Sequence, residues 1–287
     1  STPIGGPTCD GTTPNVRIVV NFGAAAFTGS CNAATGAYSI PGVSFSGDAV
    51  LTAYLNTNGG ARAVTITRTA TANVTGFNLY QDEVIVRHED TAPLSIANMA
   101  VYDSSDDSDI PFTAATGTPD TLIVAPRTEL HVWTGKTFVP GGNMTLVSGG
   151  ANGSKDGRLH IATSSVFTAA GTESHSIGGG LAVQSGATFT TASTTFTFTA
   201  TTTNKSIYAL APLSFWNATF NGVGGSWSFD NGFATTTILN TATFTAGTLT
   251  GSGDLTLTQG TLTGGGTVNM TGGTVTLENS GTFGNAN

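Results

Sequence analysis

Apolar and hydroxyl side chains alternate along much of this chain, most regularly toward its end. Segments that begin at Gly247, Gly260 and Gly273 match one another at a spacing of 13 residues (260 − 247 and 273 − 260). Stacking the segments gives three apolar columns: Leu249, Leu262 and Val275; Leu255 and Val268; and Leu257, Met270 and Phe283. Alternation predicts strands, and the glycine clusters between runs predict turns. Because such short units cannot bury their apolar sides alone, they must stack on their neighbours, which predicts a β-solenoid.

The number of residues in one coil has two interpretations. A flat coil of two strands would use 13 residues, whereas a coil with three faces would use about 20. Aromatic-rich stretches at 214–220 and 225–233 favour the larger coil, because side chains as large as Trp216 and Trp227 need a roomy interior or a subunit contact. With 13 residues to a coil, the threonines would form flat outer ladders, as in ice-binding solenoids: Thr248, Thr261 and Thr274 in one and Thr250, Thr263 and Thr276 in the other.

The first part of the chain has a different texture. Strand-like runs at 16–22, 37–40, 49–55 and 62–69 are separated by turn residues at intervals typical of an antiparallel β-sandwich. We therefore expect an all-β chain with a small Ig-like sandwich over residues 1–71 and a solenoid over residues 72–287, where alternation such as that of 187–199 continues. Cys9 and Cys31 are the only cysteines, and we expect them to form a disulfide that ties down the N-terminal segment.

Composition narrows the classes of function. Charged residues make up 9% of the chain, the formal net charge is −8, and Lys and Arg number nine without any cluster. Binding to nucleic acid or to an anionic membrane surface needs basic clusters, so neither is expected. No run approaches the roughly 20 apolar residues of a membrane-spanning helix. The start at Ser1-Thr2-Pro3 is interpreted as that of a mature secreted chain, which places the protein outside the cell or on its surface.

One loop is strongly acidic. Asp103, Asp106, Asp107 and Asp109 lie within seven residues, and oxygen-rich loops of this kind suit Ca²⁺. The loop lacks the glycine and the distal glutamate of an EF-hand. We predict either a structural calcium site that pins the loop to the solenoid or a solvated acidic loop. No other cofactor is expected.

No arrangement of residues predicts catalysis. His88 stands in Arg87-His88-Glu89-Asp90 at a strand end, without a serine nucleophile motif. His131 and His160 alternate with apolar residues and are interpreted as one side of a strand, and His175 is placed in a Gly/Ser loop. Lysines are scattered and acids are sparse after Glu173, so we predict that the chain is not an enzyme.

Aromatic side chains supply a second kind of candidate. Trp216, Trp227 and Phe283 are candidate interface or ligand residues, because aromatic rings stack on sugars and anchor subunit contacts. Their alternation with small polar residues also fits a place in the core.

Three stretches carry a resemblance to known proteins: FWNATFNGVGGSWSFDNG, VIVRHEDTAPLSIANMAVYDSSDDSDIPFTA and ELHVWTGKTFVPGG. They resemble large, repeat-rich secreted proteins of uncultivated small-genome bacteria. The resemblance covers most of the chain from Ala37 to Thr282 and is one of texture rather than of catalytic motifs. It implies β-sandwich modules joined to a right-handed parallel β-helix, and an adhesin-like or surface role.

These patterns together predict a secreted structural protein. We expect it to associate head to tail with further copies of itself into an extracellular filament, sheath or adhesin-like stalk. The alternatives are a surface module that binds glycans, or less plausibly ice, and a β-helix enzyme acting on carbohydrate.

Overall fold

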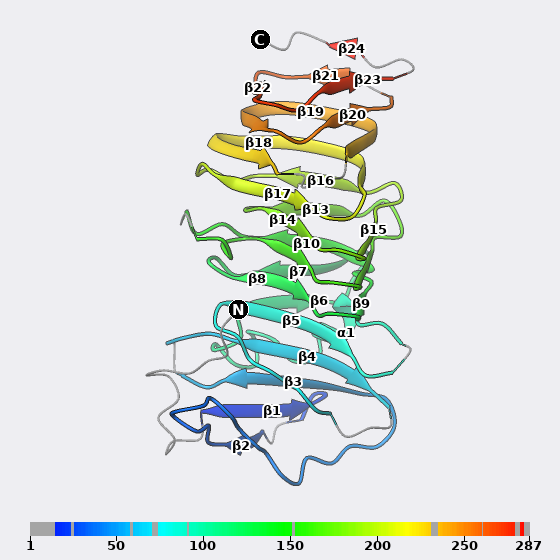
Figure 1. Ribbon diagram of the computed structural model, residues 1–287. Coiled ribbons are helices and arrows are strands. Elements are labelled where there is room, and N and C mark those ends of the chain that lie inside the picture. Colours follow the sequence, from blue (N-terminus) through cyan, green and yellow to red (C-terminus); the bar gives the residue numbers. More distant parts are fainter. Residues whose placement is uncertain are drawn as a thin grey trace.

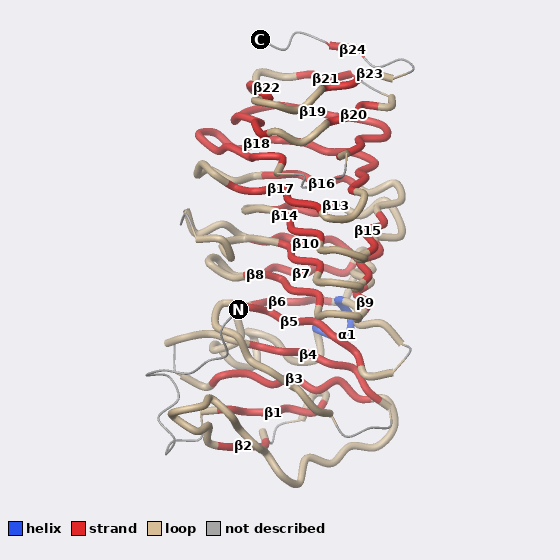
Figure 2. Tube along the Cα trace, in the orientation of Figure 1, coloured by secondary structure: helices blue, strands red, loops and turns tan. Residues whose placement is uncertain are grey.

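The computed structural model describes residues 15–23, 26–57, 60–70, 74–90, 92–150, 153–230, 235–259, 261–278 and 282–283, the last two of these and 261–263 by their backbone alone. The chain rises as a stack of coils, with β1 at one end and β24 at the other (Figure 1). It forms a β-solenoid of about nine turns. Strands predominate throughout, and in the described residues helix is confined to α1 (Ile96–Met99), as Figure 2 shows.

Parallel strands stack on three faces, and the chain visits the faces in a fixed order. The first face contains β4 (Val64–Thr69), β5 (Glu83–His88), β8 (Glu129–Val132), β11 (Leu159–Ile161), β14 (Leu181–Val183), β17 (Lys205–Ala209) and β22 (Thr267–Met270). The second contains β9 (Thr137–Phe138), β12 (Val166–Thr168), β15 (Thr188–Thr190), β20 (Leu255–Leu257) and β23 (Val275–Leu277). The third contains β6 (Phe112–Ala115), β7 (Asp120–Val124), β10 (Gly142–Leu146), β13 (Ser174–Ile177), β16 (Thr195–Phe198), β21 (Thr261–Thr263) and β24 (Thr282–Phe283).

Two long strands each run around all three faces. In β18 (Leu213–Phe229) and β19 (Thr236–Gly251), the pairing register shifts where the chain turns a corner. At one corner the Asn240 side chain donates to that of Asn217 over 2.8 Å, and Asn217 donates to Thr195 over 3.1 Å. These side-chain bonds replace the backbone ladder where the bend interrupts it.

The measured coil settles the question of coil length in favour of three faces. Leu249 pairs with Val268 (268 − 249 = 19) and Leu255 pairs with Val275 (275 − 255 = 20). Leu249, Leu262 and Val275 therefore lie on three different faces, and the 13-residue columns are wrong. The outer threonine ladders are also different from those predicted: Thr237, Thr256 and Thr276 form one, and Thr219, Thr243 and Thr263 another.

One hydrophobic core runs along the axis of the stack. It includes residues from Val19 near one end to Leu257 near the other. Identical register in successive coils places aromatic rings in columns: Phe198, Phe220 and Phe244 stack with centroid separations of 4.9 and 4.7 Å. Each ring buried in this way contributes roughly 1.5–3 kcal/mol from removal of apolar surface.

The N-terminal strands extend this stack instead of forming a separate sandwich. β1 (Val16–Val20) pairs antiparallel with β2 (Phe27–Gly29) and with β3 (Ala49–Leu55), β3 pairs antiparallel with β4, and β4 pairs parallel with β5. The side of this sheet that faces away from the main core is covered by a smaller apolar cluster. Its outer members come from loop segments, including Tyr38, Ile40 and Phe77, so the predicted Ig-like sandwich is not confirmed. The division of the chain after residue 71 stays a prediction.

Candidate functional site

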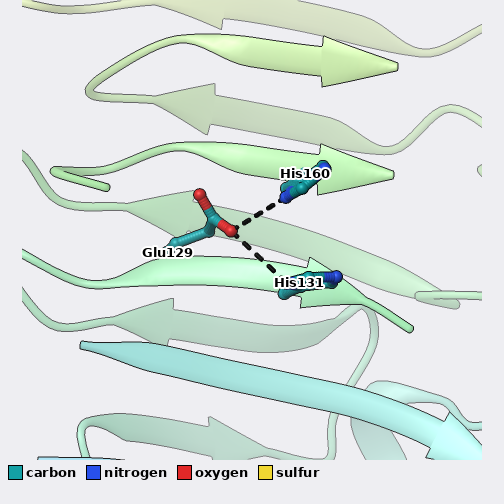
Figure 3. Close-up of side chains that lie close together, drawn as sticks. All are labelled: Glu129, His131 and His160. Atoms are coloured by element: carbon teal, nitrogen blue, oxygen red, sulfur yellow. Dashed lines mark hydrogen bonds and ion pairs between the residues drawn. The ribbon is translucent and has the colours of Figure 1, made fainter. Parts of the chain in front are cut away.

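The outer side of the first face carries a cluster of Glu129, His131 and His160 (Figure 3). Glu129 and His131 are two residues apart on β8, so both side chains leave the same side of the strand. Leu130 and Val132, between and beside them, are fully buried in the core. β11 lies parallel to β8 with His160 opposite His131, which brings the two imidazoles together.

The nitrogens of both histidines are directed at one carboxylate oxygen. Glu129 Oε1 lies 3.0 Å from His160 Nδ1 and 3.5 Å from His131 Nδ1. The ring centroids of the two histidines are 4.4 Å apart. Among the described residues, this is the one group of three or more His, Cys, Asp or Glu side chains whose ligand atoms lie within 4.8 Å of one another.

A second carboxylate and two cations surround the cluster. Glu83 on β5 places Oε2 3.1 Å from His131 Nδ1, and its Oε1 is 2.8 Å from Lys155 Nζ. Arg158 Nε donates to Oε2 of Glu129. Both carboxylates are about 1% exposed, so each is held almost entirely by protein groups. Lys155 and Arg158 together balance the charge of the two glutamates.

This arrangement shifts the pKa values of the acids and of His131. Burial alone would raise the pKa of Glu129, but hydrogen bonds from His131 and His160 and the charge of Arg158 outweigh burial and hold that pKa well below its usual range. Burial likewise opposes ionisation of Glu83, yet His131 and Lys155 lower its pKa. Burial would lower the pKa of His131, but hydrogen bonds to Glu129 and Glu83 raise it. The pocket formed by the two carboxylates therefore favours a positive charge.

Aromatic groups and a small hollow adjoin the cluster. Trp133 lies 5.6 Å from His131 between ring centroids, and Tyr80 stacks on Trp133 at 5.8 Å. On the other side, His160 Nε2 is 3.4 Å from the Gln184 amide nitrogen. A cavity of about 300 Å³ is lined there by Arg158, Gln184, Ser206 and Tyr208 among others. The outer side of the first face thus combines charged, aromatic and hydrogen-bonding groups.

Sequence reasoning missed this cluster. His131 and His160 were correctly placed on one side of a strand, but nothing indicated that the two strands are neighbours. The usable signal was the polar alternation itself, since Glu129-x-His131 and Arg158-x-His160 both interleave with Leu, Val and Ile. Stacking of those two strands on the same face would have joined them.

The four aspartates predicted to bind calcium are held by protein donors instead of meeting at one point. Asp103 and Asp109 are buried at 2% exposure. The donors are backbone N–H groups: those of Ser105 and Ala114 to Asp103, of Asp103 to Asp106, of Asp109 to Asp107, and of Thr57 to Asp109. Asp107 also accepts from the Tyr54 hydroxyl over 2.7 Å and from Arg17 over 3.2 Å. These bonds pin the loop to β1 and β3 without a metal ion, and calcium binding stays a prediction.

The other predicted site residues lie apart from the cluster. Trp227 is fully buried in the core, with its ring 5.4 Å from that of Phe220, whereas Trp216 is half-buried at the bend of β18. Phe283 lies on β24 opposite Leu262. Cys31 is buried, but Cys9 is outside the described residues, so the disulfide stays a prediction.

His175 is not in a loop, as its sequence context suggested. It lies on β13, in register with Met144 and Phe196, and its side chain is buried between the rings of Phe167 and Phe196. The Gly/Ser neighbours misled because small residues also occur within the narrow strands of this solenoid. Glu173 Oε2, 3.4 Å from His175 Nε2, is the acid nearest to it among the ion pairs of the described residues.

Comparison with known proteins found no matching family model, no matching curated protein and no matching solved structure. None of the helices in the described residues is long and apolar enough to span a membrane.

Proposed function

We propose that this chain is a rigid structural rod of an extracellular or cell-surface assembly. The observation that carries the proposal is the single hydrophobic core that runs from β1 to β20 along the axis of the stack. Because each coil is fixed to its neighbours by a full ladder of backbone bonds and by columns of side chains, the rod has no internal hinge in the described coils. A rod of this kind holds other groups at a set distance from a surface.

The surface of the later coils supports this role. Outward positions there are mainly Thr, Ser and Asn, arranged in ladders such as Thr237, Thr256 and Thr276. Hydroxyl ladders hydrate a surface without creating strong charge. This composition suits a neutral spacer, and a catalytic activity is not part of the proposal.

Self-association belongs to the same proposal. Parallel rungs stacked on one axis can be continued by the rungs of another copy, since the spacing and pairing of the backbone are the same. A head-to-tail contact of this type generates a filament, a sheath or a longer stalk. The disulfide between Cys9 and Cys31 would strengthen one end outside the cell.

Small-angle scattering and electron microscopy test this function. About nine coils at about 4.8 Å per strand spacing predict a rod of roughly 43 Å for the solenoid alone. The rod should keep its diameter and lengthen with protein concentration as copies associate. A globular particle would contradict the rod, and a length independent of concentration up to saturation would contradict self-association.

Glycan binding is the second candidate function. The stacked pair of Tyr80 and Trp133 lies on the outer side of the first face, and the cavity lined by Tyr208 and Gln184 is nearby. Sugar rings stack on aromatic faces and bond to adjacent polar groups. On a glycan array, a signal abolished by Trp133→Ala but kept by Trp216→Ala would support this candidate. Equal signals from both variants and the native chain would exclude this surface as the binding site.

A further inference from the structure

The spacing of the Glu129–His131–His160 cluster matches the coordination shell of a small metal ion. In a tetrahedral zinc site with bonds of roughly 2.0–2.1 Å, neighbouring ligand atoms are roughly 3.3–3.4 Å apart. The separations here are 3.0 Å from Glu129 Oε1 to His160 Nδ1 and 3.5 Å from the same oxygen to His131 Nδ1. Small rotations of the side chains would bring all three atoms onto one ion.

The second oxygen of each carboxylate is already engaged. Arg158 holds Oε2 of Glu129, and Lys155 holds Oε1 of Glu83, so the oxygens that face the histidines are Oε1 of Glu129 and Oε2 of Glu83. Ligating carboxylates in proteins are typically oriented by such outer hydrogen bonds. Glu83 Oε2, 3.1 Å from His131 Nδ1, is the nearest protein atom for a fourth position.

The donor set selects the kind of metal. Two imidazole nitrogens and a carboxylate oxygen suit late first-row divalent ions such as Zn²⁺, whereas Ca²⁺ and Mg²⁺ prefer shells of oxygen alone. The ligands come from two neighbouring coils, with Glu83 on a third. A bound ion would therefore cross-link β8 to β11, and through Glu83 to β5.

We propose that Glu129, His131 and His160 bind a zinc-class divalent ion that ties successive coils of the first face together. This site adds a cross-link to the proposed rod, but the rod does not depend on it. Loss of metal binding would leave the scattering length unchanged, so the two proposals fail separately.

Calorimetric titration of the metal-stripped full chain with Zn²⁺ tests the site at neutral pH. We expect about one ion per chain and an unfolding temperature that rises with Zn²⁺ concentration. The key variant is His160→Asn, whose amide nitrogen can still donate to Glu129 but is a poor zinc ligand. It should weaken binding by roughly 100-fold or more. His88→Gln is the matched control, because its amide oxygen can accept from the Thr137 N–H as His88 Nε2 does, and it should bind Zn²⁺ like the native chain.

A spectroscopic measurement keeps the proposal testable if His160→Asn does not fold. Co²⁺ added to the native chain should give the intense visible bands of a four- or five-coordinate ion with nitrogen ligands. The proposal is wrong if the native chain binds no Zn²⁺, or if Co²⁺ keeps its weak six-coordinate spectrum. It is also wrong if folded His160→Asn binds Zn²⁺ as tightly as the native chain. In those cases the cluster is a hydrogen-bonded ion network alone.

Discussion

The early and late coils of this solenoid are stabilised by different means. Eight of the nine Lys and Arg residues lie at or before residue 158, and so do the buried Glu83, Glu129 and Asp156. The late coils, made of β18 and β19, have an interior of Phe and Trp and an exterior of Thr and Ser. Early coils also vary in length, since Phe138 and Phe167 are 29 residues apart (167 − 138), whereas the later coil from Leu249 to Val268 takes 19.

The comparison teaches that regularity and chemistry are separated along the axis. Where coils are uniform, every position repeats the same packing role, and no site is distinct from the next. Where loops such as 148–158 interrupt the repeat, charged side chains gather on the outer side of the first face. Polar bonds in these early coils do work that aromatic packing does in the late ones.

The largest expected effect comes from breaking the aromatic interior of the late coils. Trp227→Ala removes a fully buried ring that contacts Phe198 and Phe220 at centroid distances of 6.4 and 5.4 Å. The cavity should lower the free energy of unfolding by about 3–5 kcal/mol. Urea unfolding followed by circular dichroism measures this loss. Trp216→Ala, at a half-buried position, should cost less than about 2 kcal/mol, and equal losses would show that Trp227 is not a core residue.

A smaller effect tests how closely the late coils approach one another. A Cβ atom on Gly222 would lie 1.8 Å from the carbonyl oxygen of Ala200 in the coil beneath. Gly222→Ala should therefore force the coils apart and cost about 2–3 kcal/mol. Gly265→Ala is the matched control, because the nearest atom to its new methyl group would be the Thr245 carbonyl oxygen at 3.7 Å. Similar thermal midpoints for the two variants would argue against this close stacking.

The smallest effect probes the polar bonds of the early coils. Asp156 is buried and accepts from the N–H groups of Gly149 and Arg127, at 2.6 and 2.9 Å, and from the Ser148 hydroxyl at 2.8 Å. Asp156→Asn should cost about 1–2 kcal/mol near neutral pH, because the amide replaces one acceptor oxygen with a donor that faces Ser148 or the backbone.

The cost of Asp156→Asn should also depend on pH. Burial would raise the pKa of Asp156, but bonds from Gly149, Ser148 and Arg127 and the charge of Lys205 hold that pKa below its usual value. A depressed pKa in the folded state gives stability that is present above the unfolded pKa of about 3.9 and is lost as pH falls through the folded value. The difference between native chain and variant should therefore shrink below about pH 4. A difference that stays constant from neutral to acid pH would contradict this assignment.

The architecture could be predicted from sequence because alternation reports directly on which side of a strand is buried. The coil could not be read from the 13-residue match, because Leu249, Leu262 and Val275 occupy three different faces. Each face takes about six or seven residues here, so a shift of 13 superimposes one face on the next but one. Similar strands on different faces imitate a shorter repeat.

The boundaries of strands and the candidate site were harder to predict. The alternation over 187–199 gave one run, but the structure divides it into β15 and β16 by a turn in which Ala192 has a φ of 28°. The Glu129–His131–His160 cluster depends on β8 stacking beneath β11 across a loop of irregular length. No period in the sequence connects those strands, so the partners of each histidine were invisible before the coils were assembled.

The three-faced coil also sets how such a chain can change in length. Duplication or loss of one coil of about 20 residues within β18–β23 would move the far end by a single increment of about 4.8 Å and leave every neighbouring contact equivalent. Recombination in that section thus adjusts reach in discrete steps. The same event between β8 and β11 would separate His131 from His160, so the early section is constrained to a fixed count.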